Sequence, residues 1–215
     1  MKRKSVLVNI NPKYFWQETA DEIEGTFRLS KQVQNAGVMV YDHYHLSIEK
    51  YFQEIKLELH STFLKSPTIN DEFYLNSLRI TTDLENQNEF YFYYWEKGLF
   101  EKLFRLNGQY SEYRDFDKKI GFKTNRSRDI QEFLADKEIR ELILNQKISI
   151  FNIQTENDVV KIKYQTSQII WDKKTLLTEY HKYEKFINGL LKINLIKPQP
   201  VTAKFIPTGC KNHNR

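Results

Sequence analysis

Hydrophobic and polar positions in the first third of the chain predict short strands next to helices. Residues 5–10 form a β-branched run, which predicts a strand. The Asn-Pro pair that follows is typical of a helix start, so we expect a helix over residues 12–24. Residues 26–34 and 38–45 then predict two strands on either side of a turn. This part of the sequence therefore mixes both kinds of element.

Residues 47–64 predict a further helix, because five large apolar residues recur at three- and four-residue intervals. These residues are Ile48, Phe52, Ile55, Leu59 and Phe63. Ser47 is a suitable N-cap for such a helix. The alternation of Ile55, Leu57 and Leu59 with polar residues also permits a strand, so the segment has two interpretations, of which we expect the helix.

The middle of the chain has the pattern of an antiparallel sheet. Residues 73–82 and 89–96 predict two strands that flank the polar turn at residues 85–88. Residues 99–106 and 118–124 predict two more, on a weaker pattern.

The C-terminal third gives the clearest pattern. Apolar spacing predicts a helix that starts near Ser127 and breaks near Asp136. Three strands follow, at residues 147–153, 159–165 and 168–171. A last helix, from residue 173 to about residue 191, is capped by the carboxylate of the aspartate before it. The order is thus helix-β-β-β-helix.

These elements define the expected fold class as α+β, with antiparallel sheet and helices packed on one face. Strands joined in sequence by tight turns pair antiparallel, and helices gathered beside them are typical of this class. We expect an N-terminal strand and helix region over residues 1–66, packed on an α+β core at residues 67–196. Residues 197–215 form a basic tail, which we expect to be extended or partly disordered.

Charge and cysteine content narrow the function classes. The net charge is +5, but residues 192–215 hold five basic residues and no acidic one. The rest of the chain is therefore neutral, so its pI alone is no argument for nucleic acid. A single cysteine, Cys210, excludes an internal disulfide and fits a cytoplasmic location. No apolar run reaches the length that spans a membrane, so we expect no membrane insertion.

One candidate catalytic set comprises Asp158, Asp172 and Lys174. The order of helix, strands and helix around them resembles the core of the PD-(D/E)xK nuclease superfamily. That resemblance implies two carboxylates that hold Mg²⁺ and a lysine that assists the attack of water on a phosphodiester. Each residue also has a structural explanation, since aspartate is common at helix N-caps and in turns.

A second candidate is the pair His43 and His45, which flank Tyr44. Two histidines two positions apart on a strand lie on the same face and can share a metal ion. The triplet looks like the metal motif of single-strand nicking and replication-initiator endonucleases. That resemblance also requires a nucleophilic tyrosine on a helix, for which Tyr180 and Tyr183 are the candidates. Ordinary half-buried histidines are the alternative.

A third feature is the aromatic run at residues 90–95. In a strand its rings alternate between the two faces, so Tyr91, Tyr93 and Trp95 share one of them. Such rings can stack on nucleic-acid bases. We favour the alternative, in which they pack in the core or in a dimer interface, because aromatic residues are common in sheets. Lys97, Lys102 and Arg105 are nearby candidates for phosphate contacts, and three lysines of the tail are further candidates for a nucleic-acid or partner surface. The tail residues are Lys197, Lys204 and Lys211.

The sequence favours a non-enzymatic intracellular interaction or accessory protein with no evident cofactor. Its expected partner is an unidentified protein or a second copy of the chain, and the basic tail adds nucleic acid as a further partner. The alternative is a Mg²⁺-dependent nuclease of the PD-(D/E)xK type, or another nucleic-acid-binding protein. Magnesium belongs only to the nuclease alternative.

Overall fold

The computed structural model describes residues 11–36, 39–65, 73–75, 77–85, 87–98, 109–145 and 149–198. Its strands are β1 Thr26–Ala36, β2 Met39–Phe52, β3 Ile55–Lys65, β4 Phe73–Leu75, β5 Ser77–Glu85, β6 Phe92–Glu96, β7 Ile120–Thr124, β8 Ser149–Glu156 and β9 Val159–Ile169. Its helices are α1 Pro12–Glu22, α3 Arg114–Asp117, α4 Ser127–Ala135, α5 Lys137–Asn145 and α6 Lys173–Lys192. The predicted strands at residues 5–10 and 99–106 lie outside the described residues.

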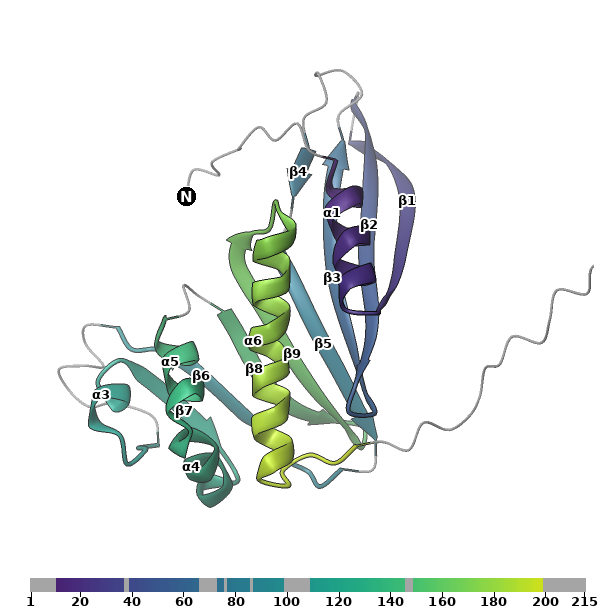
Figure 1. Cartoon of the computed structure of the whole chain (residues 1–215). Helices are drawn as coiled ribbons and strands as arrows, with labels where there is room; N and C mark the ends of the chain where they lie inside the picture. The colour runs from purple at the N-terminus through teal and green to yellow at the C-terminus, as the bar shows by residue number, and fades with distance from the viewer. Residues whose placement is uncertain are drawn as a thin grey trace, which may run out of the picture.

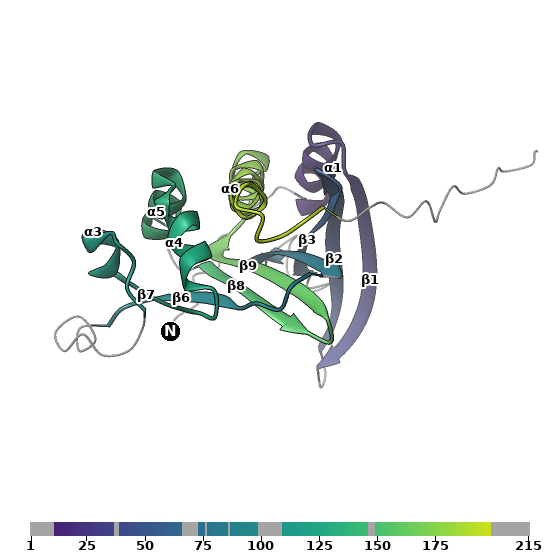
Figure 2. The same ribbon diagram turned by 90° about the horizontal axis from the view of Figure 1, so that it is seen from below.

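The strands form one nine-stranded sheet in the order β1-β2-β3-β5-β9-β8-β6-β7, and β4 pairs with β3. Every pairing is antiparallel. The sheet bends along its width, so that β1, β2 and β3 are steeply inclined to β6 and β7 (Figure 2). Together with the helices it confirms the predicted α+β class.

The helices α1, α4, α5 and α6 cover one face of the sheet (Figures 1 and 2). The central helix α6 buries one side against β8 and β9, where Phe186 stacks on Phe151 with ring centroids 4.4 Å apart. At its start the Asp172 carboxylate accepts a hydrogen bond from the backbone of Thr175, which confirms the predicted cap. The predicted break at Asp136 is also confirmed, because α4 ends and α5 begins there.

The helix expected over residues 47–64 is wrong. Residues up to Phe52 continue β2, and Ile55 begins β3 after a two-residue turn. In β3 every second residue from Ile55 to Phe63 is buried, which is the period of a strand. Residues four apart satisfy both the strand and the helix period, so the apolar spacing alone did not separate the two structures.

Two details of the strand predictions also differ from the structure. The strands on either side of residues 85–88 do not pair with each other: β5 pairs with β3 and β9, whereas β6 pairs with β7 and β8. The segment 168–171 is not a separate strand, because β9 runs without interruption to Ile169. The C-terminal unit therefore has two strands between its helices.

Candidate functional site

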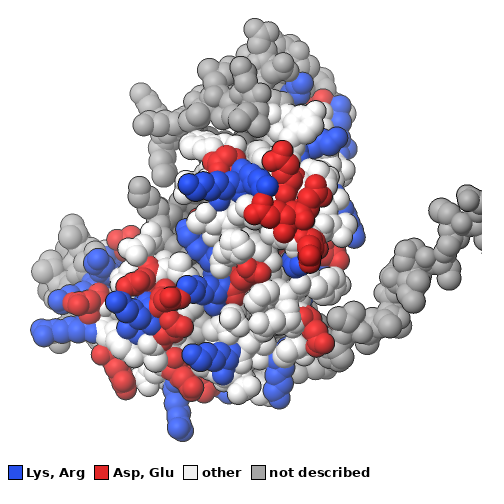
Figure 3. Space-filling view, viewed as in Figure 1, with Lys and Arg blue, Asp and Glu red and all other residues white. Residues whose placement is uncertain are grey.

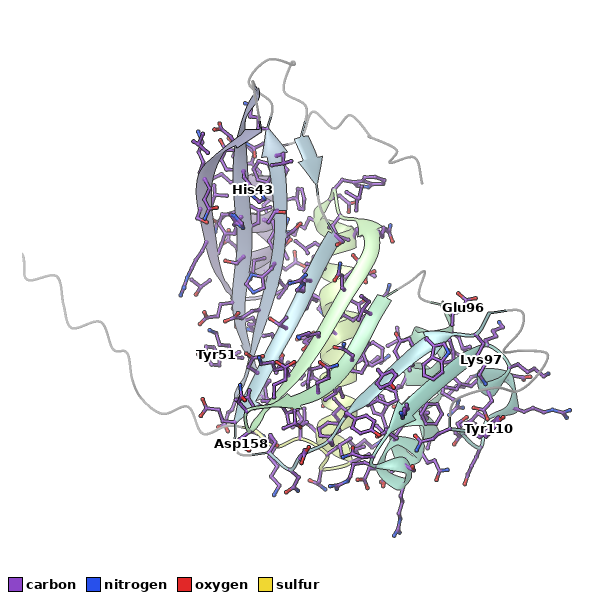
Figure 4. The ribbon with its side chains drawn as sticks, turned by 180° about the vertical axis from the view of Figure 1, so that it is seen from behind. His43, Tyr51, Glu96, Lys97, Tyr110 and Asp158 are labelled. Carbon is purple, nitrogen blue, oxygen red and sulfur yellow. The ribbon has the colours of Figure 1, made fainter. Side chains whose placement is uncertain are left out.

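The two faces of the sheet differ in what covers them. In β5 the residues Leu78, Ile80 and Leu84 are buried beneath the helices, whereas Arg79 and Asp83 point to the opposite face and are exposed. Figure 4 shows this second face, over which no described helix lies. We call it the helix-free face. It holds the predicted histidine pair, His43 and His45, and the predicted aromatic residues Tyr91, Tyr93 and Trp95.

An open groove of about 950 Å³ crosses the helix-free face over β1, β2, β3, β5 and β9. Two arginines, two histidines, one glutamine, two leucines and several hydroxyl residues line it, and none of the described lining residues is acidic. The charged, imidazole and amide residues are Arg28, Arg79, His45, His60 and Gln165, and the hydroxyl residues include Ser30, Ser47, Thr62, Ser77 and Thr81.

Strand register brings the groove residues together. Arg28 lies opposite Ser47, Ser47 opposite His60, His60 opposite Arg79, and Arg79 opposite Gln165. Cross-strand neighbours of this kind have Cβ atoms about 5 Å apart, so five strands contribute one continuous row. A row of adjacent hydrogen-bond donors on a rigid sheet suits a ligand with several acceptor atoms.

Two carboxylates border the groove, but a lysine binds both. Lys56 forms ion pairs with Glu49 at 3.1 Å and Glu58 at 2.5 Å. Burial opposes ionisation of Lys56, yet these two partners outweigh it and raise the lysine's pKa. Burial likewise opposes ionisation of Glu58, yet Lys56 and then His60 outweigh it and lower that pKa. Lys56 and Arg28 together balance the charges of Glu49 and Glu58, so Arg79 is the groove arginine whose charge these carboxylates do not offset.

Arg79 is the cation with the fewest competing contacts in the groove. It is exposed, and among the described residues it has no ion-pair partner. Arg28, by contrast, lies 3.6 Å from Glu49. A guanidinium presents five N–H donors in a planar fork, which matches carboxylate and phosphate oxygens.

His43 and His45 lie on one face of β2, as predicted, with ring centroids 4.4 Å apart. Burial lowers the pKa of His43, and the neighbouring His45 lowers it further. The Nε2 atom of His45 is buried without a hydrogen-bond partner among the described residues. Within the same part of the chain, no three His, Cys, Asp or Glu side chains gather in a group able to hold a metal ion.

The tyrosines required by the nicking-enzyme interpretation lie on the other side of the sheet. Tyr183 donates a hydrogen bond to Thr82 Oγ1 at 2.8 Å, and Tyr180 donates one to Glu184 at 2.5 Å. Burial raises the pKa of both phenols, and the bond to Glu184 raises that of Tyr180 further. The sheet therefore separates these hydroxyls from the histidine pair.

The three PD-(D/E)xK candidates are not brought together. Asp158 sits in the β8–β9 turn with a φ of 64°, and Asp172 caps α6 at the other end of β9. The 11 residues of β9 hold the two aspartates roughly 30 Å apart. Lys174 lies in the first turn of α6, beside Asp172 alone. Both aspartates thus occupy the structural positions that were the alternative explanation.

The aromatic residues Tyr91, Tyr93 and Trp95 do lie together on the helix-free face. Ring centroids are 6.3 Å apart for Tyr91 and Tyr93, and 5.9 Å apart for Tyr93 and Trp95. All three are half-buried. Phe90 and Phe92 alternate with them and are buried on the opposite face. The prediction that one set of rings would share a face is consistent with this arrangement.

Lys97 is not free to contact phosphate, contrary to the expectation for it. Its ammonium group donates a hydrogen bond to the backbone of Asp117 at 2.7 Å and lies 5.4 Å from the centre of the Tyr110 ring (Figure 4). The side chain is buried. Lys102 and Arg105 lie outside the described residues.

Of the predicted tail surface, only Lys197 lies in the described part of the chain. Its backbone N–H donates to Gln87 at 2.9 Å, which fixes the start of the tail next to β5. Lys204 and Lys211 lie outside the described residues.

No helix in the described ranges is long and apolar enough to cross a membrane. The expected association of this chain with a second copy of itself, or with another protein, is still a prediction.

Sequence reasoning missed Arg28, Arg79 and His60 as members of one site. His60 belongs to the segment that was expected to be a helix, and on a helix it would not lie beside Arg79. The available signal was the alternation along residues 55–63, which places His60 on the polar side of a strand.

No protein-family model, curated protein or solved structure matches this chain. The geometry of the helix-free face is therefore the basis for a functional proposal.

Proposed function

We propose that this is a non-enzymatic binding protein that holds an anionic ligand in the groove of its helix-free face. The observation that carries the proposal is the lining of the groove by Arg28, Arg79, His45 and His60, without a carboxylate among the described lining residues. Phosphate and carboxylate groups are the ligands that such donors recognise.

The surroundings of the groove support this choice. The helix-covered side of the molecule has positive and negative side chains interspersed, with acidic residues gathered beside α1 (Figure 3). There Lys173 forms an ion pair with Glu22 at 2.6 Å. Surface ion pairs of this kind cancel each other's field. In the groove, by contrast, Arg79 keeps its charge available to a ligand.

The candidate catalytic residues support binding over hydrolysis. Asp172 and Asp158 act in a helix cap and a turn at opposite ends of β9, and Tyr183 is bonded within the core. Their hydrogen bonds and backbone positions are those of structural residues. In the groove, by contrast, Arg79 is exposed and has no ion-pair partner among the described residues.

Titration with inorganic tripolyphosphate tests the proposal. The chain has five histidines, so the imidazole proton signals can be assigned by single substitutions. We expect tripolyphosphate to shift the signals of His45 and His60, which line the groove, and to leave that of His181 on α6 unchanged. Arg79→Gln should weaken binding about tenfold, since a charge-assisted hydrogen bond contributes about 1.5–3 kcal/mol.

The matched control is Arg128→Gln, which removes the same charge from an exposed position on α4. It should bind tripolyphosphate with unchanged affinity. Equal shifts at His181, or equal weakening by both arginine substitutions, would show unspecific attraction and overturn the proposal.

A further inference from the structure

We infer that the ligand of the helix-free face is a single-stranded nucleic acid, whose phosphates occupy the groove and whose bases reach the aromatic row of β6. This inference rests on the proposed function, because it assigns a class to the anion that the groove binds. It is carried by a different set of residues, on β6, β7, β8 and β9.

A continuous row of side chains connects the groove to the aromatic residues. Thr81, which lines the groove, lies opposite Lys163, and Lys163 lies opposite Asn152. Asn152 in turn lies opposite Tyr93, and Tyr93 opposite Lys123. At about 4.8 Å per strand, Thr81 and Tyr93 are roughly 14 Å apart. A ligand that uses both the groove and the rings must therefore be extended.

The aromatic row offers planar surfaces at the far end of this path. Tyr91, Tyr93 and Trp95 remain partly exposed on this face, whereas Phe92 on the opposite face is fully buried. The Trp95 indole lies against Gly121 of β7, where a Cβ atom would come within 2.6 Å of the ring. The glycine thus gives the ring room to lie close to the sheet. Rings of this kind stack on bases without regard to sequence.

The charges along the path also suit a polynucleotide. Lys163 and Lys123 stand on either side of the segment formed by Asn152 and Tyr93. Lys123 is exposed and has no ion-pair partner among the described residues. Of the acidic residues on this face, Asp83 and Glu156 lie toward the β8–β9 turn, to one side of the row. Glu58 lies opposite Thr81 at the end of the row, and both Glu58 and its neighbour Glu49 form ion pairs with Lys56. A phosphate backbone is attracted to the row and repelled from the turn.

Buried polar atoms without a hydrogen-bond partner in the described part of the chain occur on the helix-free face, in the groove and in the middle of the row. Among the described residues, three buried side-chain atoms have no hydrogen-bond partner: Trp16 Nε1, His45 Nε2 and Asn152 Oδ1. Two of them belong to the helix-free face, one in the groove and one beside Tyr93. Buried polar groups usually have hydrogen-bond partners, so these two atoms are exceptions on this face.

Bases are available for stacking in a single strand, whereas in a duplex they face each other. The inference therefore predicts a preference for single strands. The test is fluorescence anisotropy of a labelled oligothymidylate of about 12 nucleotides, and of a duplex of the same length, between about 50 and 200 mM salt. The full chain and three single variants are compared: Arg79→Gln in the groove, Tyr93→Leu in the aromatic row, and Arg128→Gln as the control.

We expect the single strand to bind more tightly than the duplex, with an affinity that falls steeply as salt rises. Arg79→Gln should weaken binding of the single strand about tenfold, through the lost charge-assisted hydrogen bond. Tyr93→Leu should weaken it by a similar factor, because one stacked base contributes that much or more. Tyr93→Leu should leave tripolyphosphate binding unchanged, since the ring lies outside the groove. Circular dichroism must show that each variant is folded.

Three outcomes overturn the inference and leave the proposed function intact. In the first, the single strand binds Tyr93→Leu as tightly as the parent chain; in the second, the duplex binds as tightly as the single strand; in the third, binding of the single strand depends only on the basic residues of the tail. A full-length chain with Lys204, Lys211 and Arg215 changed to glutamine tests the last of these. If neither tripolyphosphate nor the single strand responds to Arg79→Gln, the proposed function itself fails.

Discussion

The two faces of the sheet are made from alternate residues of the same strands, yet one is mainly apolar and buried and the other is mainly polar and partly exposed. In β6 the ring of Phe92 is surrounded by Phe122, Phe133 and Phe151 in the core, whereas the next residue, Tyr93, lies half-buried on the helix-free face. One face holds the apolar area that stabilises the fold. The other holds arginines, histidines and tyrosines that are exposed or half-buried.

This difference separates stability from binding. Apolar burial stabilises the helix-covered face by about 25 cal/mol for each Å² removed from water. Arg79 and Lys123 contribute nothing of that kind, because they are exposed. Substitutions on the two faces should therefore affect different measurements, and each of the following predictions tests that separation.

The largest expected effect comes from neighbouring substitutions in β6. Phe92→Ala removes a fully buried ring and leaves a cavity, so the free energy of unfolding should fall by about 3–5 kcal/mol. Tyr93→Leu keeps an apolar side chain on the helix-free face, so the free energy of unfolding should change by less than about 1 kcal/mol. Urea denaturation followed by circular dichroism measures both. A comparable loss from Tyr93→Leu would mean that the helix-free face also carries stability.

An intermediate effect is expected where the helix-free face is tightly packed. Gly121→Ala puts a Cβ atom 2.6 Å from the Trp95 ring, so the ring must move. Displacement of this kind typically costs about 1–3 kcal/mol. With Trp95→Leu in place, the same change should be neutral or stabilising, because glycine in a strand is less stable than alanine by about 0.5–1 kcal/mol.

A double-mutant cycle over these four proteins gives the coupling between Gly121 and Trp95. A coupling near zero would show that the ring is not held against the glycine. In that case the aromatic row would lack the rigid placement that the nucleic-acid inference requires.

Two hairpins show why one part of the fold could be predicted from the sequence and another could not. The β8–β9 turn has Asn157 and Asp158 at positive φ, and residues of this type favour such turns, so the hairpin was predicted. The β2–β3 turn has the same geometry, with φ of 46° at Gln53 and 64° at Glu54. Glutamine and glutamate rarely adopt it, so no turn signal interrupted the apparent helix.

The candidate site was predictable only where its members lie on one strand. His43 and His45, or Tyr91, Tyr93 and Trp95, share a face because strand residues alternate. The groove instead depends on which strands are neighbours. Arg79 meets His60 on β3 and Gln165 on β9, which is 86 positions further along the chain, and local pattern carries no information about such pairing.

The smallest expected effect concerns His43, which burial and the neighbouring His45 make harder to protonate. Its pKa in the folded protein lies below the ordinary value of 6.5 that it regains on unfolding. The unfolded chain therefore binds more protons than the folded one as the pH falls through 6.5. This histidine has no effect on stability above that pH. It reduces stability as the pH falls below 6.5, until the folded form is protonated as well.

His43→Gln removes this titration, so the variant should lose less stability than the parent between about pH 7 and pH 5. Urea denaturation across that range measures the difference, and titration of the assigned imidazole signal measures the pKa directly. The remaining histidines are common to both proteins and cancel in the comparison. Parallel stability profiles would show that His43 is hydrated like a surface histidine, and the helix-free face near β2 would then be more open to water than its packing indicates.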